Sequence, residues 1–137
     1  MKQGYRYILL AIYLTLIFYV LTKPVSKSFV IFIEYWPFKI PIDKCVHFCL
    51  FTPMPFFIWI CTFKQSKEWI RRVTTLSVSI LIALSTEILQ YFLPKRSFEW
   101  LDIVADAFGI TFGFILTIII YHIWKKTIEN YLSNNQI

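Results

Sequence analysis

The stretch that decides the fold is residues 101–124, LDIVADAFGITFGFILTIIIYHIW. It is apolar and long enough for a helix that crosses the hydrocarbon core of a membrane, which takes about 20 residues. Asp102, Asp106, Gly109 and Gly113 recur in it at helical spacing, so they share one stripe. The two glycines allow another backbone to approach closely. We therefore expect the acidic stripe to face other helices rather than lipid.

The composition of the whole chain agrees with a membrane protein. Hydrophobic residues make up 58% of the sequence, aromatic residues 20% and charged residues only 16%, and the mean hydropathy is +0.62. Soluble domains are nearer to half apolar and a quarter charged. The net charge of +6 is typical of loops that anchor a membrane protein to anionic lipid. Nucleic acid is not an expected partner.

Three further apolar stretches precede the first one described. The predicted spans are residues 7–22, 45–63, 73–92 and 101–124. We therefore predict an all-α, polytopic membrane protein with a bundle of four transmembrane helices, in a single domain over residues 1–137. Pro53 and Pro55 predict a kink in the second span. The apolar stretch within residues 23–44, residues 29–33, is too short to span. The aromatic and Lys residues around it predict an interfacial segment, with a re-entrant turn as the alternative.

The distribution of positive charge predicts the orientation. Eight of the 14 Lys and Arg residues lie on the side of the two termini and six on the other side. Positive residues are enriched in cytoplasmic loops. Both termini are therefore predicted to be cytoplasmic, and the opposite ends of the helices face outward.

Polar residues gather at one membrane face. In four alternating spans, the start of the second, the end of the third and the start of the fourth lie together. The polar residues there, and the predicted ligand-binding residues, are Asp43, Lys44, His47, Glu87, Gln90, Arg96, Asp102 and Asp106. Ser79, Ala83, Glu87 and Gln90 share one stripe of the third span. Lys95 and Glu99 are expected to be solvated loop charges.

These residues carry a resemblance to a known family. The pattern is Lys44-x-x-His47, then Glu87-x-x-Gln90, Arg96 and Asp102-x-x-x-Asp106-x-x-Gly109-x-x-x-Gly113, within a core motif region of residues 41–114. It resembles the VanZ-like proteins, whose founding relatives raise tolerance to the glycopeptide teicoplanin. Asp106 departs from the pattern, because the family usually has Asn there. The resemblance implies a protein of the bacterial cytoplasmic (inner) membrane.

The first functional hypothesis is an outward-facing polar pocket that engages an anionic headgroup. Lys44 and Arg96 would grip phosphate, and His47 would add a third donor. Acids such as Glu87 would orient the cations. The expected partners are membrane lipids or a lipid-linked cell-wall intermediate.

Two other hypotheses come from different classes. In a membrane enzyme acting on a lipid phosphate or glycan, His47 would be the base or nucleophile, oriented by Asp43 or Glu87, and the catalytic residues would be His47, Glu87 and Asp102. In a structural protein without a ligand, the same residues would form an ion-paired clamp between helices.

A metal is the least favoured alternative. His47, Glu87, Asp102 and Asp106 form a mixed nitrogen and oxygen donor set. Lys44 and Arg96 nearby oppose a cation, and the sequence has no recognised metal motif. No metal and no cofactor are therefore expected.

Overall fold

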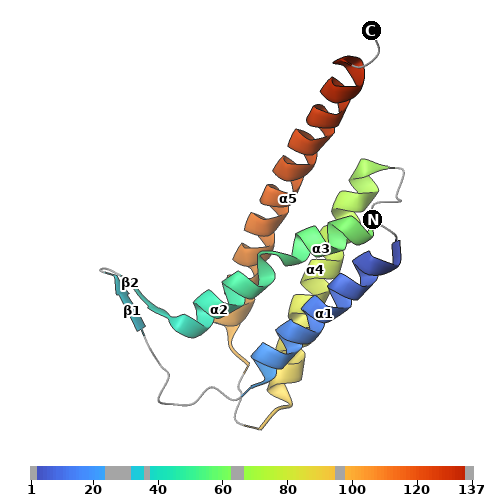
Figure 1. Cartoon of the computed structure of the whole chain (residues 1–137). Helices are drawn as coiled ribbons and strands as arrows, with labels where there is room; N and C mark the ends of the chain where they lie inside the picture. Colours follow the sequence, from blue (N-terminus) through green and yellow to red (C-terminus); the bar gives the residue numbers. More distant parts are fainter. Residues whose placement is uncertain (1–2, 24–31, 36–37, 63–66, 95–97, 135–137) are drawn as a thin grey trace.

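The structure, a computed structural model, describes residues 3–23, 32–35, 38–62, 67–94 and 98–134 (Figure 1). Its elements in chain order are α1 (Gln3–Thr22), β1 (Phe32–Tyr35), β2 (Phe38–Pro41), α2 (Ile42–Phe51), α3 (Met54–Cys61), α4 (Glu68–Tyr91) and α5 (Trp100–Asn134).

Four helical segments are long and apolar enough to cross a membrane. They are Gly4–Thr22, Ile42–Cys61, Glu68–Tyr91 and Trp100–Tyr131. Large apolar side chains on their outer surfaces, such as Ile12, Leu81 and Phe108, are more than 60% exposed. Such a surface suits lipid and not water. The predicted bundle of four transmembrane helices is confirmed, and the chain is a multi-pass membrane protein.

The second span is two helices that meet at a proline. The amide of Thr52 donates to the carbonyl of Phe48 at 3.0 Å near the end of α2, and the Pro53 carbonyl accepts the first bond of α3 from Phe56 at 3.1 Å. Pro53 has no amide hydrogen and its ring clashes with the preceding turn, so the helix cannot pass through it unbroken. The predicted kink is therefore a full break between α2 and α3.

The segment before α2 contains a small hairpin that the sequence analysis did not predict. β1 and β2 pair antiparallel, with Phe32 opposite Pro41 and Tyr35 opposite Phe38. β2 runs directly into α2. The rest of the expected interfacial segment, residues 24–31 and 36–37, lies outside the described residues.

Helix α5 is longer than the fourth predicted span. It has 35 residues and continues to Asn134 instead of ending at residue 124. At 1.5 Å per residue it is about 52 Å long, well over the ~30 Å hydrocarbon core. Figure 1 shows its C-terminal part projecting beyond the other helices.

The bundle packs most closely where α2 meets α5. A Cβ added at Gly109 would lie 2.6 Å from the carbonyl oxygen of Phe48, and one added at Gly113 would collide with that of Thr52. The glycine stripe of α5 therefore faces α2, as predicted. An apolar core of Ile17, Leu21, Phe51, Met54, Ile58, Ala83 and Ile110 lies deeper in the bundle.

Helix α1 packs against α3 and α4. The Tyr13 ring stacks on Phe57 with 4.5 Å between centroids. The Tyr13 hydroxyl donates to the carbonyl of Leu50. Leu50 lies in the last turn of α2, just before the break at Pro53. Most of α1 is exposed and faces the surrounding lipid.

Candidate functional site

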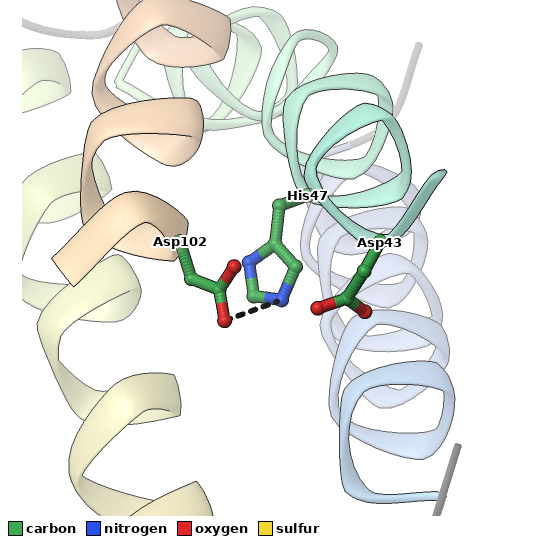
Figure 2. A group of neighbouring side chains, drawn as sticks. All are labelled: Asp43, His47 and Asp102. Carbon is green, nitrogen blue, oxygen red and sulfur yellow. Dashed lines mark ion pairs between the residues drawn. The ribbon is translucent and has the colours of Figure 1, made fainter. Parts of the chain in front are cut away.

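Four of the five buried ionisable side chains among the described residues meet at one end of the bundle, because three elements end or begin there. The first turns of α2 carry Asp43, Lys44 and His47, the last turns of α4 carry Glu87 and Gln90, and the first turns of α5 carry Asp102 and Asp106. Glu99 lies just before α5. We call Asp43, Lys44, His47, Glu87, Glu99, Asp102 and Asp106 the polar cluster. Figure 2 shows the His47 ring between Asp43 of its own helix and Asp102 of α5.

The helical stripes that predicted this meeting are present. Ser79, Ala83, Glu87 and Gln90 are all buried on one side of α4. Asp102 and Asp106 are 2% and 0% exposed on the side of α5 that faces α2. The acids of both spans therefore point into the bundle.

Lys44 contributes the ammonium group of the polar cluster. Its ammonium forms an ion pair with Asp102, and its Nζ lies 2.5 Å from Oε2 of Glu99 and 3.5 Å from Oδ2 of Asp43. The Lys44 side chain is only 10% exposed. It links the start of α2 to the start of α5. Glu99, expected to be a solvated loop charge, is half-exposed but takes part in this link.

His47 lies at the centre of the cluster and is fully buried. Its Nδ1 is 2.9 Å from Oδ1 of Asp106 and 3.9 Å from Oε1 of Glu87, and its Nε2 is 3.8 Å from Oδ2 of Asp102. The sequence analysis assigned the orientation of this imidazole to Asp43 or Glu87. The carboxylate within hydrogen-bond distance of the imidazole is instead that of Asp106, on α5.

Several buried polar atoms of the cluster have no hydrogen-bond partner within the described part of the chain. They are Nε2 of His47, both carboxylate oxygens of Glu87 and Oδ2 of Asp106. Buried polar groups in folded proteins are paired in the great majority of cases, and buried charges are costly when unpaired. The cluster therefore has unused capacity to hold a ligand, a cation or water.

Of the two remaining predicted site residues, Gln90 binds outside the cluster and Arg96 is not among the described residues. The side-chain amide of Gln90 donates to the carbonyl oxygen of Leu21 at 3.0 Å, which ties α4 to the end of α1. Gln90 therefore has a packing role. Arg96, the second predicted phosphate-binding cation, lies outside the described residues, as does Lys95.

The charge of the described cluster is negative. Five carboxylates (Asp43, Glu87, Glu99, Asp102 and Asp106) surround one ammonium and one imidazole. Such an excess of acid in a bundle interior is expensive unless it is offset. Part of the offset must come from a ligand, from protons or from residues outside the described part.

The acids and His47 also form two groups with metal-ligand geometry. In Asp43, His47 and Asp102, and in His47, Glu87 and Asp106, one donor atom per residue lies within 4.8 Å of the others. The sequence analysis treated Glu87, Asp102 and Asp106 as one set around His47. The structure divides that set into two groups on either side of the imidazole.

A second buried charge lies away from the polar cluster, and the sequence analysis missed it. Arg71, on the first turns of α4, is 4% exposed. Its guanidinium lies 3.8 Å from the ring centroid of Trp59 and 4.5 Å from that of Tyr121. The spacing of Arg71, Thr75 and Ser79 on one helix stripe could have predicted this burial.

Comparison with known proteins supports the pattern seen in the sequence. The family model described as VanZ/LLP1 matches residues 5–121. An uncharacterised protein of the fission yeast Schizosaccharomyces pombe is 34% identical over 92 residues, which cover 66% of this chain and 54% of the yeast protein. The chain thus spans about half the length of that curated relative. No solved structure matches the chain.

Proposed function

The chain belongs to the VanZ/LLP1 family, and on that basis we propose that its polar cluster engages the phosphate-bearing headgroup of a lipid or of a lipid-linked cell-envelope glycan. Two observations carry the proposal. The Lys44 ammonium supplies the charge that a phosphate requires. The buried polar atoms without partners around His47, Glu87 and Asp106 can accept hydrogen bonds from hydroxyl groups of the headgroup or glycan. A clamp that only holds helices together gains most when every buried polar group is paired. Unused capacity at the meeting point of three helices favours a ligand.

The position of the cluster supports a headgroup as that ligand. It lies at the start of α2 and α5 and the end of α4, which is one end of three membrane-spanning segments. Lys44 supplies an ammonium there, and the short connection from α4 to α5 adds Lys95 and Arg96. Lys and Arg are the side chains that bind phosphate oxygens most strongly.

The test compares lipid retention by purified protein. The variant Lys44→Met with Arg96→Met is compared with Lys125→Met with Lys126→Met, an equal loss of charge near the other end of α5. Each protein is reconstituted in phosphatidylcholine containing phosphatidic acid or undecaprenyl phosphate, extracted, and measured by native mass spectrometry. We expect the first variant to lose the anionic lipid and the second to keep it. Equal retention by both would contradict the proposal.

Hydrolysis of the same headgroup is a second candidate, favoured by the contact between His47 and Asp106. A proton on Nδ1 would be donated to Oδ1 of Asp106 at 2.9 Å, which leaves Nε2 as the basic nitrogen. Nε2 has no hydrogen-bond partner in the described chain. An imidazole oriented by a carboxylate, with its other nitrogen open, is the arrangement of a general base. It would take a proton from water as the water oxygen bonds to phosphorus. The bond from phosphorus to the lipid-side oxygen would break, and the protonated imidazole would return the proton to that leaving oxygen.

This candidate is tested by turnover. Purified protein is incubated with undecaprenyl phosphate or undecaprenyl pyrophosphate, and released phosphate is measured. We expect His47→Gln to lower the rate by about 100-fold or more. Cys49→Ala, an exposed position on the same helix, is the control and keeps the rate. No release by the unaltered protein would leave binding without turnover as the function.

The finer properties that the family resemblance implies are part of the same proposal. We propose an outward-facing cluster, cytoplasmic termini and, in a bacterial host, a contribution to teicoplanin tolerance. Expression in a teicoplanin-susceptible Gram-positive strain, with His47→Gln as the control, tests the phenotype by the inhibitory concentration.

A further inference from the structure

Three buried side chains of the polar cluster contact one another and pair with no Lys or Arg of the described residues. His47 of α2, Glu87 of α4 and Asp106 of α5 are each at most 1% exposed. One donor atom from each lies within 4.8 Å of the other two. Lys44 pairs with Asp102, Glu99 and Asp43, which are the other acids of the cluster. The charge of Glu87 and Asp106 is therefore not offset by the ammonium.

The carboxylate oxygens around His47 have lone pairs that no described residue uses and that could coordinate a cation. The Glu87 carboxylate has no side-chain hydrogen bond, only a backbone contact with Glu99, and Oδ2 of Asp106 accepts no hydrogen bond from the described residues. Oδ1 of Asp106 has a single such contact, to Nδ1 of His47. Carboxylates as deeply buried as these are expected to be paired, hydrogen-bonded or bound to a metal.

We propose that His47, Glu87 and Asp106 bind one divalent transition-metal ion of the Mn²⁺ or Zn²⁺ class. One imidazole nitrogen with two carboxylates is a donor set that these ions accept. A neutral imidazole and two carboxylates carry two negative charges, which a divalent cation offsets. The proposal replaces the sequence-based expectation of no metal, because the Lys44 ammonium that opposed a cation is held by the other three acids. Arg96, the second opposing charge, lies outside the described residues.

The distances in this group suit such an ion. Ligand bonds of about 2.1 Å place neighbouring donor atoms roughly 3–3.5 Å apart. Nδ1 of His47 lies 2.9 Å from Oδ1 of Asp106 and 3.9 Å from Oε1 of Glu87. These values bracket that range, so small side-chain shifts complete the site. Three protein ligands leave coordination positions for water or a ligand.

The surroundings of His47 also agree with metal binding through Nδ1. Its proton would then be on Nε2, 3.8 Å from Oδ2 of Asp102. Metal-binding histidines usually donate their other N–H to a carboxylate, and a small shift of the ring or of Asp102 would bring this pair into hydrogen-bond distance. Lys44 holds Asp102 in place from the other side.

The second group with metal-ligand geometry fits less well. Asp43, His47 and Asp102 also converge within 4.8 Å. Asp102 already pairs with the ammonium of Lys44, which lies 3.5 Å from Asp43 as well. A positive charge at that point repels a second cation and competes for the same oxygens. We therefore assign the ion to the group that contains Glu87.

The inference deepens the proposed function and rests on it for its purpose. A bound divalent cation would reverse part of the negative charge of the cluster and offer phosphate oxygens a ligand position. It would also occupy Nδ1 of His47, the atom that donates to Asp106 in the general-base hypothesis. Metal binding and a His47 base are thus alternatives.

The test measures Mn²⁺ binding by the full-length protein. Protein in phosphatidylcholine nanodiscs is stripped with EDTA, exchanged into metal-free buffer and titrated with MnCl₂, with free Mn²⁺ followed by its EPR signal. We expect one Mn²⁺ per chain, and an affinity lowered by about tenfold or more in Glu87→Gln and Asp106→Asn. Glu129→Gln, an exposed acid near the far end of α5 and outside the polar cluster, keeps its affinity. No saturable binding, or equal weakening by all three variants, would overturn the proposal.

A second measurement on the unaltered protein does not depend on folded variants. Pulsed EPR of the bound Mn²⁺ is expected to show coupling to a nitrogen nucleus, from His47. Binding without that coupling would overturn the assignment. Retention of phosphatidic acid, measured with and without Mn²⁺, separates the two proposals. Lipid retained by protein that binds no Mn²⁺ would sink only the metal site, whereas Mn²⁺ bound with no anionic lipid retained in either condition would sink only the proposed function.

Discussion

Arg71 and Arg72 are adjacent in the sequence and have opposite environments in α4. The guanidinium of Arg71 is buried between the rings of Trp59 and Tyr121. The Arg72 side chain is 42% exposed and pairs with Glu68 one helical turn away. A desolvated cation–π contact is worth about 2 kcal/mol, and an exposed pair one turn apart about 0.3–0.5 kcal/mol.

We expect Arg71→Ala to lower the free energy of unfolding by about 2 kcal/mol or more, and Arg72→Ala to change it by less than about 0.5 kcal/mol. Chemical unfolding in mixed micelles, followed by tryptophan fluorescence, measures both. Equal losses would mean that the stacking of Arg71 contributes nothing beyond an ordinary surface charge.

Gln90 allows a test that separates a role in helix packing from a role in lipid binding. Its amide donates to the Leu21 carbonyl and joins the ends of α4 and α1. Gln90→Leu should cost about 1 kcal/mol of stability, as for other hydrogen bonds between membrane helices. Retention of anionic lipid should not change, because Gln90 contributes nothing to the unpaired atoms around His47. Ser85→Ala, on the exposed side of the same helix, is the control, and a loss of lipid in Gln90→Leu would place Gln90 in the site.

The residues of the candidate site could be found from sequence, but not their pairing. Helical spacing predicted the stripes of α4 and α5, and both are buried. Spacing within one helix cannot say which residues meet across helices. The choice of Asp106 rather than Asp43 for His47 depends on how closely α5 approaches α2, which Gly109 and Gly113 set. The burial of Arg71 was missed because its charge was counted only for topology.

At the scale of elements, the approach of α2 and α5 gives a graded prediction. A Cβ added at Gly4 would meet nothing within 4 Å. One added at Gly109 would lie 2.6 Å from the carbonyl oxygen of Phe48, and one added at Gly113 would lie still closer to the carbonyl oxygen of Thr52. Backbone cannot move aside as a side chain can, so overpacking there costs about 1–3 kcal/mol. We expect melting temperatures to fall in the order Gly4→Ala, Gly109→Ala, Gly113→Ala, with no loss for the first. A different order would mean that α2 and α5 are further apart.

The bounds of the elements were predicted where local chemistry decides them. Pro53 removes an amide hydrogen, so the break in the second span follows from one residue. The hairpin of β1 and β2 has no such signal, because its strands are four residues each and lie in an aromatic-rich segment that suits an interface as well. The end of α5 was predicted at the end of the uninterrupted apolar run, although a segment with polar residues such as Lys125 and Glu129 continues the helix.

For the whole molecule, the number of spans fixes the relation of the termini. Four spans place both ends of the chain on one side, and the excess of Lys and Arg predicts that this side is the cytoplasm. Epitope tags at the two ends should both be protected from protease in intact spheroplasts and both be cleaved after lysis. Tags with opposite protection would mean that one of the four segments does not cross the membrane, and two accessible tags would mean inverted orientation.

The polar cluster is divided among α2, α4 and α5, so it can be assembled only after all three helices have been synthesised. Synthesis runs from the N-terminus, so His47 and Glu87 enter the membrane before Asp102 and Asp106 exist. Until α5 arrives, the two earlier groups lie in a partial bundle without the aspartates that contact His47. Isolated ionisable groups are costly at that depth. Insertion of the last span therefore completes the polar cluster. A nascent chain that ends before residue 100 would expose His47 and Glu87 without the aspartates of α5.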